Sequence, residues 1–212
     1  MHSSRQLTST QQAQPSPTHK TWVGLELIVA TLLLTAFVAS TVHISGRSME
    51  PTLHHGDYAL VIKLDAWLNK LGWHTLKRGD IIYFDAPNHP HTRGSTSRGR
   101  AWLPLLGSEP LYIKRLIALP GERVRIDRDQ VFVDDVVLDE PYIQGLSDYT
   151  MTELTVPEGH YFVLGDNRVP LGSTDSRHFG VIPAADVYGR ATLVLFPFRR
   201  GGQVNLKLLS NE

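Results

Sequence analysis

The stretch Leu111–Leu119 reads LYIKRLIAL and is followed at once by Pro120-Gly121. A short apolar run that stops at a Pro-Gly pair is typical of a buried strand. Two adjacent cations, Lys114 and Arg115, interrupt the run. Since successive side chains of a strand point to opposite faces, we expect one cation to point inward and the other to pair at the surface.

Similar runs lie on both sides of this stretch. They occupy residues 58–62, 80–84, 124–126, 131–133, 136–138, 161–164 and 189–196, and Gly, Pro or Asp residues separate many of them. Outside the N-terminal region, helical periodicity is confined to 65–71. Repeated short strands with such punctuation predict a mainly β fold, built of coiled antiparallel sheets or a partly closed β-barrel.

An apolar segment precedes the strands, over residues 22–44, with Glu26 as its one acid. As a helix, a segment of this length can cross a hydrocarbon core of about 30 Å. We therefore predict a disordered tail over 1–21, a transmembrane anchor over 22–44, and a β-rich domain over 45–212 with an inserted loop at 88–110. An alternative takes 27–39 as the apolar part of a cleaved signal peptide, with cleavage near Val38-Ala39-Ser40.

The charges that flank the apolar segment predict its orientation. Arg5 and Lys20 precede it, whereas Arg47 is the one cation in the comparable length that follows. Since cations concentrate on the cytoplasmic side, we expect a single pass through the plasma membrane with a cytoplasmic N-terminus. The β-rich domain then lies on the outer face.

Composition excludes several classes of function. The chain has 212 residues, with 21 Lys and Arg against 21 Asp and Glu, so its formal net charge is zero and nothing indicates a nucleic-acid partner. It has no cysteine, which excludes disulfides, thiolate metal sites and cysteine nucleophiles. The roughly 170 residues after the apolar segment suit one domain.

A serine stands four residues beyond the apolar segment, in the run Ser48–Leu53, which reads SMEPTL. A serine hydroxyl becomes a good nucleophile only when a base takes its proton. That base can be a histidine, or a lysine whose pKa has been lowered by burial among apolar groups. Lys114, within its apolar run, fits the second description.

Four motifs in order strengthen this interpretation. They are Ser48–Leu53, Arg78–Ile82, Tyr112–Leu116 with Leu119–Glu122, and Gly165–Arg168 with Ser173–Arg177. From Gly46 to about Phe196 the chain resembles the type I signal peptidases, which are membrane-bound serine proteases with a Ser-Lys dyad.

The resemblance implies a role for each matching residue. Ser48 attacks the scissile carbonyl, and Lys114 acts as general base and then as general acid. Ser173 hydrogen-bonds the lysine amine and orients it. The residues that form supporting ion pairs are Asp175 with Arg177, and Arg115 with Asp166.

The resemblance also implies a substrate cleft near the serine, with Gly46, Met49 and Pro51 beside it. Gly46 stands where some members carry a second serine, so the oxyanion is expected to rely on backbone N–H groups, including that of Ser48. The segment 169–172 is longer than the usual spacing and bears on the register of Ser173.

By resemblance, the chain removes signal peptides from secretory preproteins and cleaves after small residues. Its partners are those signal peptides and the lipid bilayer, and no cofactor or metal is implied. Three alternatives remain at this point. One is a Ser-His hydrolase using His54, His55 or His178, and another is a metal site at His74, His89 and His91. The third is a membrane-tethered β-domain that binds peptide without cleaving it.

Overall fold

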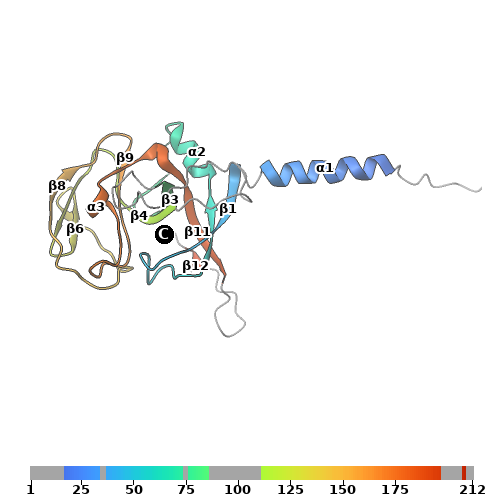
Figure 1. The fold of residues 1–212 in the computed structure, drawn as a ribbon. Coiled ribbons are helices and arrows are strands. Elements are labelled where there is room, and N and C mark those ends of the chain that lie inside the picture. The colour runs from blue at the N-terminus through green and yellow to red at the C-terminus, as the bar shows by residue number, and fades with distance from the viewer. Residues whose placement is uncertain (1–16, 34–36, 74–75, 86–110, 197–206, 209–212) are drawn as a thin grey trace, which may run out of the picture.

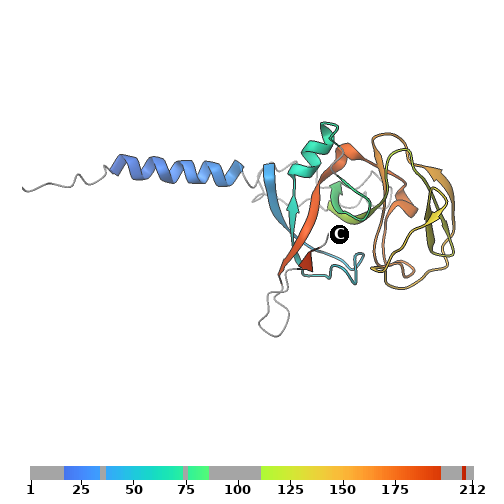
Figure 2. The same cartoon turned by 180° about the vertical axis from the view of Figure 1, so that it is seen from behind.

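A computed structural model of the protein describes residues 17–33, 37–73, 76–85, 111–196 and 207–208. Two antiparallel sheets form the body of the molecule, and the N-terminal helix extends away from it (Figures 1 and 2). The predicted mainly β architecture is confirmed. The larger sheet is curled into a half-barrel, and the smaller sheet packs at its far end from the helix.

The larger sheet has the strand order β1-β2-β11-β3-β4-β9-β10, with β12 paired to β11. Its strands are β1 (Ala39–His43), β2 (Tyr58–Ile62), β3 (Ile81–Asp85), β4 (Leu111–Ala118), β9 (His160–Leu164), β10 (Ile182–Pro183), β11 (Val187–Phe196) and β12 (Lys207–Leu208). The predicted strands on β2, β3, β4, β9 and β11 are confirmed within a residue or two. Strand β4 lies between β3 and β9, which places Lys114 in the interior of the sheet.

The smaller sheet has the order β7-β6-β5-β8. Its strands are β5 (Arg123–Asp127), β6 (Gln130–Val133), β7 (Val136–Val137) and β8 (Met151–Thr155). Two-residue turns at 128–129 and 134–135 connect β5 to β6 and β6 to β7, and all four turn residues have positive φ. This is the conformation that favours tight hairpins.

Short helices pack against the larger sheet. Helix α2 (Leu64–Lys70) lies against β11 and α3 (Ser176–Phe179) against β9, and a 3-10 turn spans Ala184–Asp186. The predicted helix at 65–71 corresponds to α2, whereas α3 and strands β8, β10 and β12 were not expected, because each is short or polar in sequence.

One apolar cluster joins the two sheets. It combines Ile117 from β4 and Phe162 from β9 with Val124 from β5 and Val131 from β6, and these side chains are at most 1% exposed. Burial of aliphatic and aromatic side chains on this scale holds the sheets together. The sheets therefore form one body around the motifs of the site.

The N-terminal region differs from its prediction. Helix α1 (Pro17–Leu33) begins inside the predicted tail, and the last residues of the predicted 22–44 anchor form strand β1, paired to β2 from Ala39↔Ile62 to His43↔Tyr58. Thr41 and Val42 are β-branched, and Val42 packs against the core, which favours a strand here. Among the residues described, no helix combines the length and apolarity that a membrane crossing requires. The predicted loop at 88–110 and the tail over 1–16 lie outside these residues.

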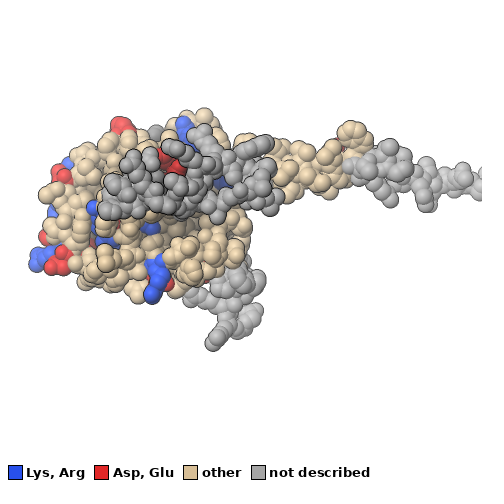
Figure 3. Space-filling view, viewed as in Figure 1, with Lys and Arg blue, Asp and Glu red and all other residues tan. Residues whose placement is uncertain are grey.

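Charged side chains are scattered over the surface. On the face seen in Figure 3, the described Lys, Arg, Asp and Glu side chains do not gather into a large patch of one sign.

Candidate active site

Ser48 lies on a turn that follows β1. The Glu50 N–H donates to the carbonyl of Arg47 at 3.2 Å, and the Leu53 N–H donates to the carbonyl of Met49 at 2.9 Å. Met49 and Leu53 are 1% and 0% exposed within the core. These two buried side chains anchor the turn, while Ser48 itself stays half-buried and accessible.

Lys114 reaches this turn from β4. Its Nζ lies 2.6 Å from Ser48 Oγ and donates to the Ile113 carbonyl at 2.9 Å. The lysine is 3% exposed, and its Nζ lies 5.5 Å from the centre of the Tyr112 ring. The two residues that the motifs singled out are therefore in direct hydrogen-bond contact.

The surroundings of Lys114 change its acidity. Burial lowers the pKa of the Lys114 amine from 10.5 to about 8, because the ammonium form loses hydration. The carboxylates of Asp175 and Asp166 raise this pKa, and the Arg177 guanidinium lowers it further. Near pH 8 a substantial share of the amine is therefore neutral and able to accept a proton.

Arg115 pairs with Asp166, as expected, but not at the surface. Its Nε and Nη2 donate to the two carboxylate oxygens at 2.8 and 2.6 Å, and the two side chains are 2% and 0% exposed. Thr52 Oγ1 donates to the same carboxylate at 2.5 Å. The expectation of a surface pairing is wrong because the loop carrying Asp166 covers the second face of β4.

Asp175 and Arg177 form the second expected pair. Arg177 Nε and Nη2 each donate to the Asp175 carboxylate at 2.9 Å, and the Gly165 N–H donates to it at 3.0 Å. Despite its burial, the pKa of Asp175 is lowered, chiefly through Arg177. Asp175 also caps α3 by accepting from the Arg177 N–H, so the pair and the short helix support each other.

Ser173 is brought to the site but does not make the expected bond. It is 4% exposed, and its Oγ makes no well-formed hydrogen bond, to Lys114 or to any other group, although a weak hydrogen bond toward the Asp175 carboxylate contributes to the lowered pKa of Asp175. A Cβ on Gly165 would lie 2.3 Å from Ser173 Oγ and 2.4 Å from the Ser48 carbonyl. Ser173 and the nucleophile turn thus both crowd the Cβ position of one glycine, so the long segment 169–172 leaves Ser173 at the site.

Comparison with known proteins assigns the family. Residues 19–196 match the family described as signal peptidase, peptidase S26. The chain belongs to the signal peptidase family. It is 36% identical over 177 residues to a probable signal peptidase I-1 of Synechocystis. The aligned region covers 84% of this chain and 81% of the relative. Signal peptidase I of Bacillus caldolyticus is 33% identical over 193 residues, covering 84% of this chain and 90% of its own.

A crystal structure of a similar protein is also known. The crystal structure of a signal peptidase I from Enterococcus faecalis is 35% identical, covers 55% of this chain and 97% of its own, and has a TM-score of 0.39. The family predicted from the motifs is confirmed by the sequence matches, and the chain is a peptidase.

Asn167 also belongs to the site of this signal peptidase, although it was not predicted from the sequence. Its backbone N–H donates to the Ser48 carbonyl at 3.1 Å, and its Nδ2 donates to the Arg47 carbonyl at 3.0 Å. The two bonds fasten the nucleophile turn to the loop that carries Asp166. Its position within the Gly165–Arg168 motif could have identified it. In the same way, the Ser48–Leu53 motif could have identified Thr52, which donates to Asp166.

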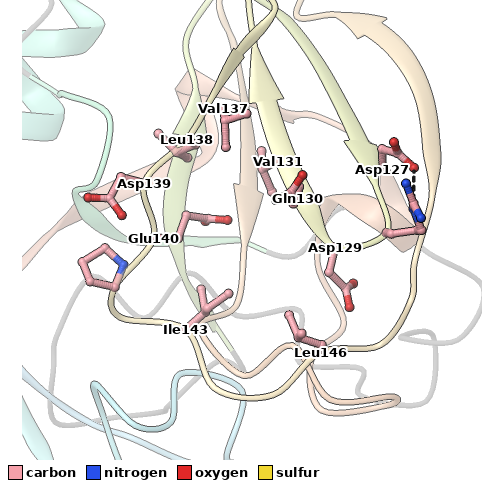
Figure 4. Close-up of a pocket in the computed structure, with 12 residues that line it drawn as sticks. Asp127, Asp129, Gln130, Val131, Val137, Leu138, Asp139, Glu140, Ile143 and Leu146 are labelled. Atoms are coloured by element: carbon pink, nitrogen blue, oxygen red, sulfur yellow. Dashed lines mark ion pairs between the residues drawn. The ribbon is translucent and has the colours of Figure 1, made fainter.

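A third buried ion pair connects the site to the segment that follows β7. Arg168 pairs with Glu140, and its Nε donates to the Gly165 carbonyl at 2.8 Å. Glu140 also lines a pocket of about 560 Å³ beside the smaller sheet, formed by residues within 127–131 and 137–146 (Figure 4). Ser48 and Lys114 do not line this pocket. No sequence motif marked Glu140.

The histidines of the rival hypothesis lie beside residues other than Ser48 in the described structure. His55 Nδ1 accepts from the Gly46 N–H at 3.2 Å, and the Nδ1 atoms of His54 and His178 lie 3.9 Å from Asp57 and Asp175. His74, His89 and His91, the rival metal ligands, lie outside the described residues. Among the residues that the structure does describe, no three metal-binding side chains gather into a site.

The expected cleft residues surround Ser48. Gly46 has φ +102, a conformation that L residues rarely adopt, Met49 is buried beneath the turn, and Pro51 is exposed on it. The described structure thus gathers all ten expected site residues on one turn, one strand, one loop and the short helix α3 that follows the loop.

Proposed function

We propose that the protein is a type I signal peptidase, a serine endopeptidase that removes signal peptides from exported preproteins. Ser48 is its nucleophile and Lys114 its general base. The observation that carries the proposal is the 2.6 Å contact between Lys114 Nζ and Ser48 Oγ, made by a lysine that is 3% exposed. Membership of the signal peptidase family supports the same substrate class.

The chemistry follows from this contact. Neutral Lys114 accepts the hydroxyl proton while Ser48 Oγ forms a bond to the scissile carbonyl carbon. The resulting ammonium donates its proton to the leaving amine, and the acyl-enzyme remains on Ser48. A water molecule then gives a proton to Lys114 as its oxygen attacks the ester, and the return of that proton to Ser48 Oγ releases the carboxylate product.

The paired carboxylates keep Lys114 usable as a base. An unpaired carboxylate beside a lysine stabilises the ammonium form and raises its pKa. Here Asp175 is neutralised by Arg177 and Asp166 by Arg115, so burial dominates. The two arginines act on the reaction through the acidity of Lys114 and without contact to substrate.

Ser173 is proposed to orient the lysine amine during the reaction. Its buried hydroxyl lacks a partner, and it packs against Gly165, which also touches the Ser48 carbonyl. A buried hydroxyl without a hydrogen bond is unfavourable, which favours a partner in another state of the site.

The peptide is proposed to bind as an added strand. Strand β1 stands at the end of the sheet order and leads directly into the Ser48 turn. An extended peptide can add to such an edge through main-chain hydrogen bonds, and its small side chains are then proposed to lie toward Met49. The Gly46 N–H is engaged by His55, so the oxyanion is assigned to the Ser48 N–H.

Attachment to a lipid membrane is also part of the proposal. The exposed apolar side chains of α1 include Trp22, Leu25, Leu27 and Ile28, which are 52 to 65% exposed. Apolar surface of this extent favours contact with lipid. The charge bias around 22–44 supports the finer prediction of one pass through the plasma membrane, with a cytoplasmic N-terminus and the β-rich domain outside.

The first experiment incubates the detergent-solubilised full chain with a preprotein that carries an Ala-x-Ala site. Cleavage after that site by the unmodified protein, and its loss in Ser48→Ala and Lys114→Ala, supports the dyad. His54→Ala, His55→Ala and His178→Ala should retain cleavage after the same bond. Peptide binding without cleavage by any form supports the non-catalytic alternative instead.

Orientation needs a separate measurement. Because the chain lacks cysteine, Ser3→Cys and Glu153→Cys give single labelling sites before and after the apolar segment. A membrane-impermeant maleimide applied to intact cells should label only the second variant. Labelling of the first variant alone contradicts the proposed topology.

A further inference from the structure

The segment Val169–Gly172 forms a β-turn directly before Ser173. The Gly172 N–H donates to the Val169 carbonyl at 2.9 Å, and Pro170 and Leu171 occupy the two central positions. Leu171 has φ +61. Proline followed by a residue with positive φ is the pattern of a type II turn, whose third position favours Gly or Asn.

Leu171 is therefore unfavourable there in two respects. A left-handed backbone crowds the Cβ atom of a leucine, and the side chain is 99% exposed, so it gains no burial in return. An outlier of this kind is a basis for inferring function, because strained residues concentrate where ligands bind.

The turn belongs to a small apolar surface, defined here as Leu146, Val169, Pro170 and Leu171. Leu146 is 70% exposed and Val169 36% exposed. The two loops that carry this surface are joined, because Gln144 bridges to Asn167 and a Cβ on Gly145 would lie 2.3 Å from Val169 Cγ1. Apolar side chains thus gather on adjacent loops.

This surface is fastened to the nucleophile turn. The Val169 N–H donates to Asn167 Oδ1 at 3.3 Å, and a Cβ on Gly172 would lie 2.6 Å from the same oxygen. Asn167 in turn donates to the Ser48 carbonyl. Leu171 follows Asn167 by four residues, and a chain of that length spans at most about 14 Å. Leu171 therefore lies within a few residue lengths of a peptide bound at Ser48.

We propose that the apolar surface around Leu171 binds the apolar core of the signal peptide while the bond beyond it is cleaved. The inference rests on the proposed function. A signal peptide carries 7–15 apolar residues shortly before its small-residue cleavage site, so its chemistry matches that of this surface. A leucine at the tip of the turn then exchanges exposure to water for contact with the substrate.

The test compares two substrates in detergent solution. One is a preprotein with a complete signal peptide, and the other is a short peptide that spans the cleavage site without the apolar core. Leu171→Asn removes the apolar side chain and relieves the backbone, so the melting temperature should rise by about 2–4 °C. The KM for the preprotein should rise about fivefold with kcat unchanged, and the short peptide should be cleaved as before.

Two control variants isolate the cause. Leu171→Met keeps an apolar side chain at the same strained position and should retain the preprotein KM. Val136→Asn removes an apolar side chain that is 69% exposed on β7 of the smaller sheet, and it should change neither KM nor kcat.

Other outcomes overturn the inference. An equal loss on both substrates shows that the turn only supports Ser173, and unchanged KM values show no contact with the apolar core. Reduced flotation of Leu171→Asn with lipid vesicles, with the KM in detergent unchanged, assigns the surface to lipid instead. If the unmodified chain cleaves neither substrate, the proposed function fails first, and the inference fails with it.

Discussion

Lys114 Nζ lies 2.6 Å from Ser48 Oγ, although 66 residues separate them in the chain. Strand β4 carries the lysine and the turn after β1 carries the serine, and the sheet order places β2, β11 and β3 between β1 and β4. The dyad geometry is therefore a product of the curled sheet, because only its curvature brings the turn over β4.

The pH dependence of cleavage reports the acidity of Lys114. The general base must be neutral, and burial lowers the pKa of Lys114 to about 8. The rate kcat/KM should therefore rise with pH and reach half of its plateau near pH 8. Initial rates on a short peptide between pH 6 and 10 measure this, and a half-maximum near pH 6 would point to a histidine base.

Lys114→Met should abolish cleavage and stabilise the fold at neutral pH. The folded state binds the proton of Lys114 less tightly than the unfolded chain, since the pKa is about 8 against 10.5. The resulting penalty is present in full below pH 8 and disappears as pH rises to about 10.5. Methionine removes it, so urea unfolding at pH 7 should show a gain on the order of 2 kcal/mol.

That gain should shrink at pH 10. An equal gain in the free energy of unfolding at both pH values would show that the charge of Lys114 does not destabilise the fold. Ser48→Ala serves as the activity control, because it abolishes cleavage without removing a buried cation.

Arg177→Met should shift the pH profile to higher pH. Without the guanidinium, the negative charge of Asp175 near Lys114 is no longer offset by a positive one, so the amine becomes harder to deprotonate. Loss of one partner of a buried pair should also destabilise the fold by about 3 kcal/mol. Activity over pH 6–10 and thermal unfolding are the two measurements.

Arg123→Met is the matched control for that variant. Arg123 pairs with Asp135 and Glu153 at the exposed surface of the smaller sheet, with a side chain that is 44% exposed. Its replacement should leave the pH profile unchanged. A shift of equal size in both variants would mean that general charge, and not the pair at Asp175, sets the profile.

Ser173→Ala should separate activity from stability. Removing a buried hydroxyl that has no partner leaves the free energy of unfolding unchanged or slightly higher. Loss of an orienting contact to Lys114 should lower kcat about tenfold, with KM unchanged. Unchanged kcat would restrict Ser173 to packing against Gly165.

Gly165→Ala should reduce both activity and stability. An added Cβ meets Ser173 Oγ and the Ser48 carbonyl at 2.3 and 2.4 Å, so the nucleophile turn must move. Gly159 offers a control at the other end of β9, since nothing lies within 4 Å of its Cβ position. Because Gly159 has φ +69, Gly159→Asn is the suitable replacement there and should leave kcat unchanged.

Local sequence signals were sufficient for the mainly β class and most strands, whereas the candidate dyad was predicted from four motifs in order and the family they resemble. Period-two runs ended by Gly, Pro or Asp are local signals, and so is a lysine isolated among apolar residues. Helix α1 was located only approximately. Its boundary with β1 depends on pairing with β2, and a continuous apolar segment contains no local signal for that change.

Only the tertiary structure decided the surroundings of the dyad. The burial of Arg115, the unpaired hydroxyl of Ser173 and the bonds from Asn167 to the nucleophile turn depend on loops that meet across the sheet. The pair between Arg168 and Glu140 likewise joins segments 28 residues apart. Propensity and periodicity describe near neighbours, whereas burial and pairing depend on how distant segments pack, so the acidity of Lys114 emerges only in the folded chain.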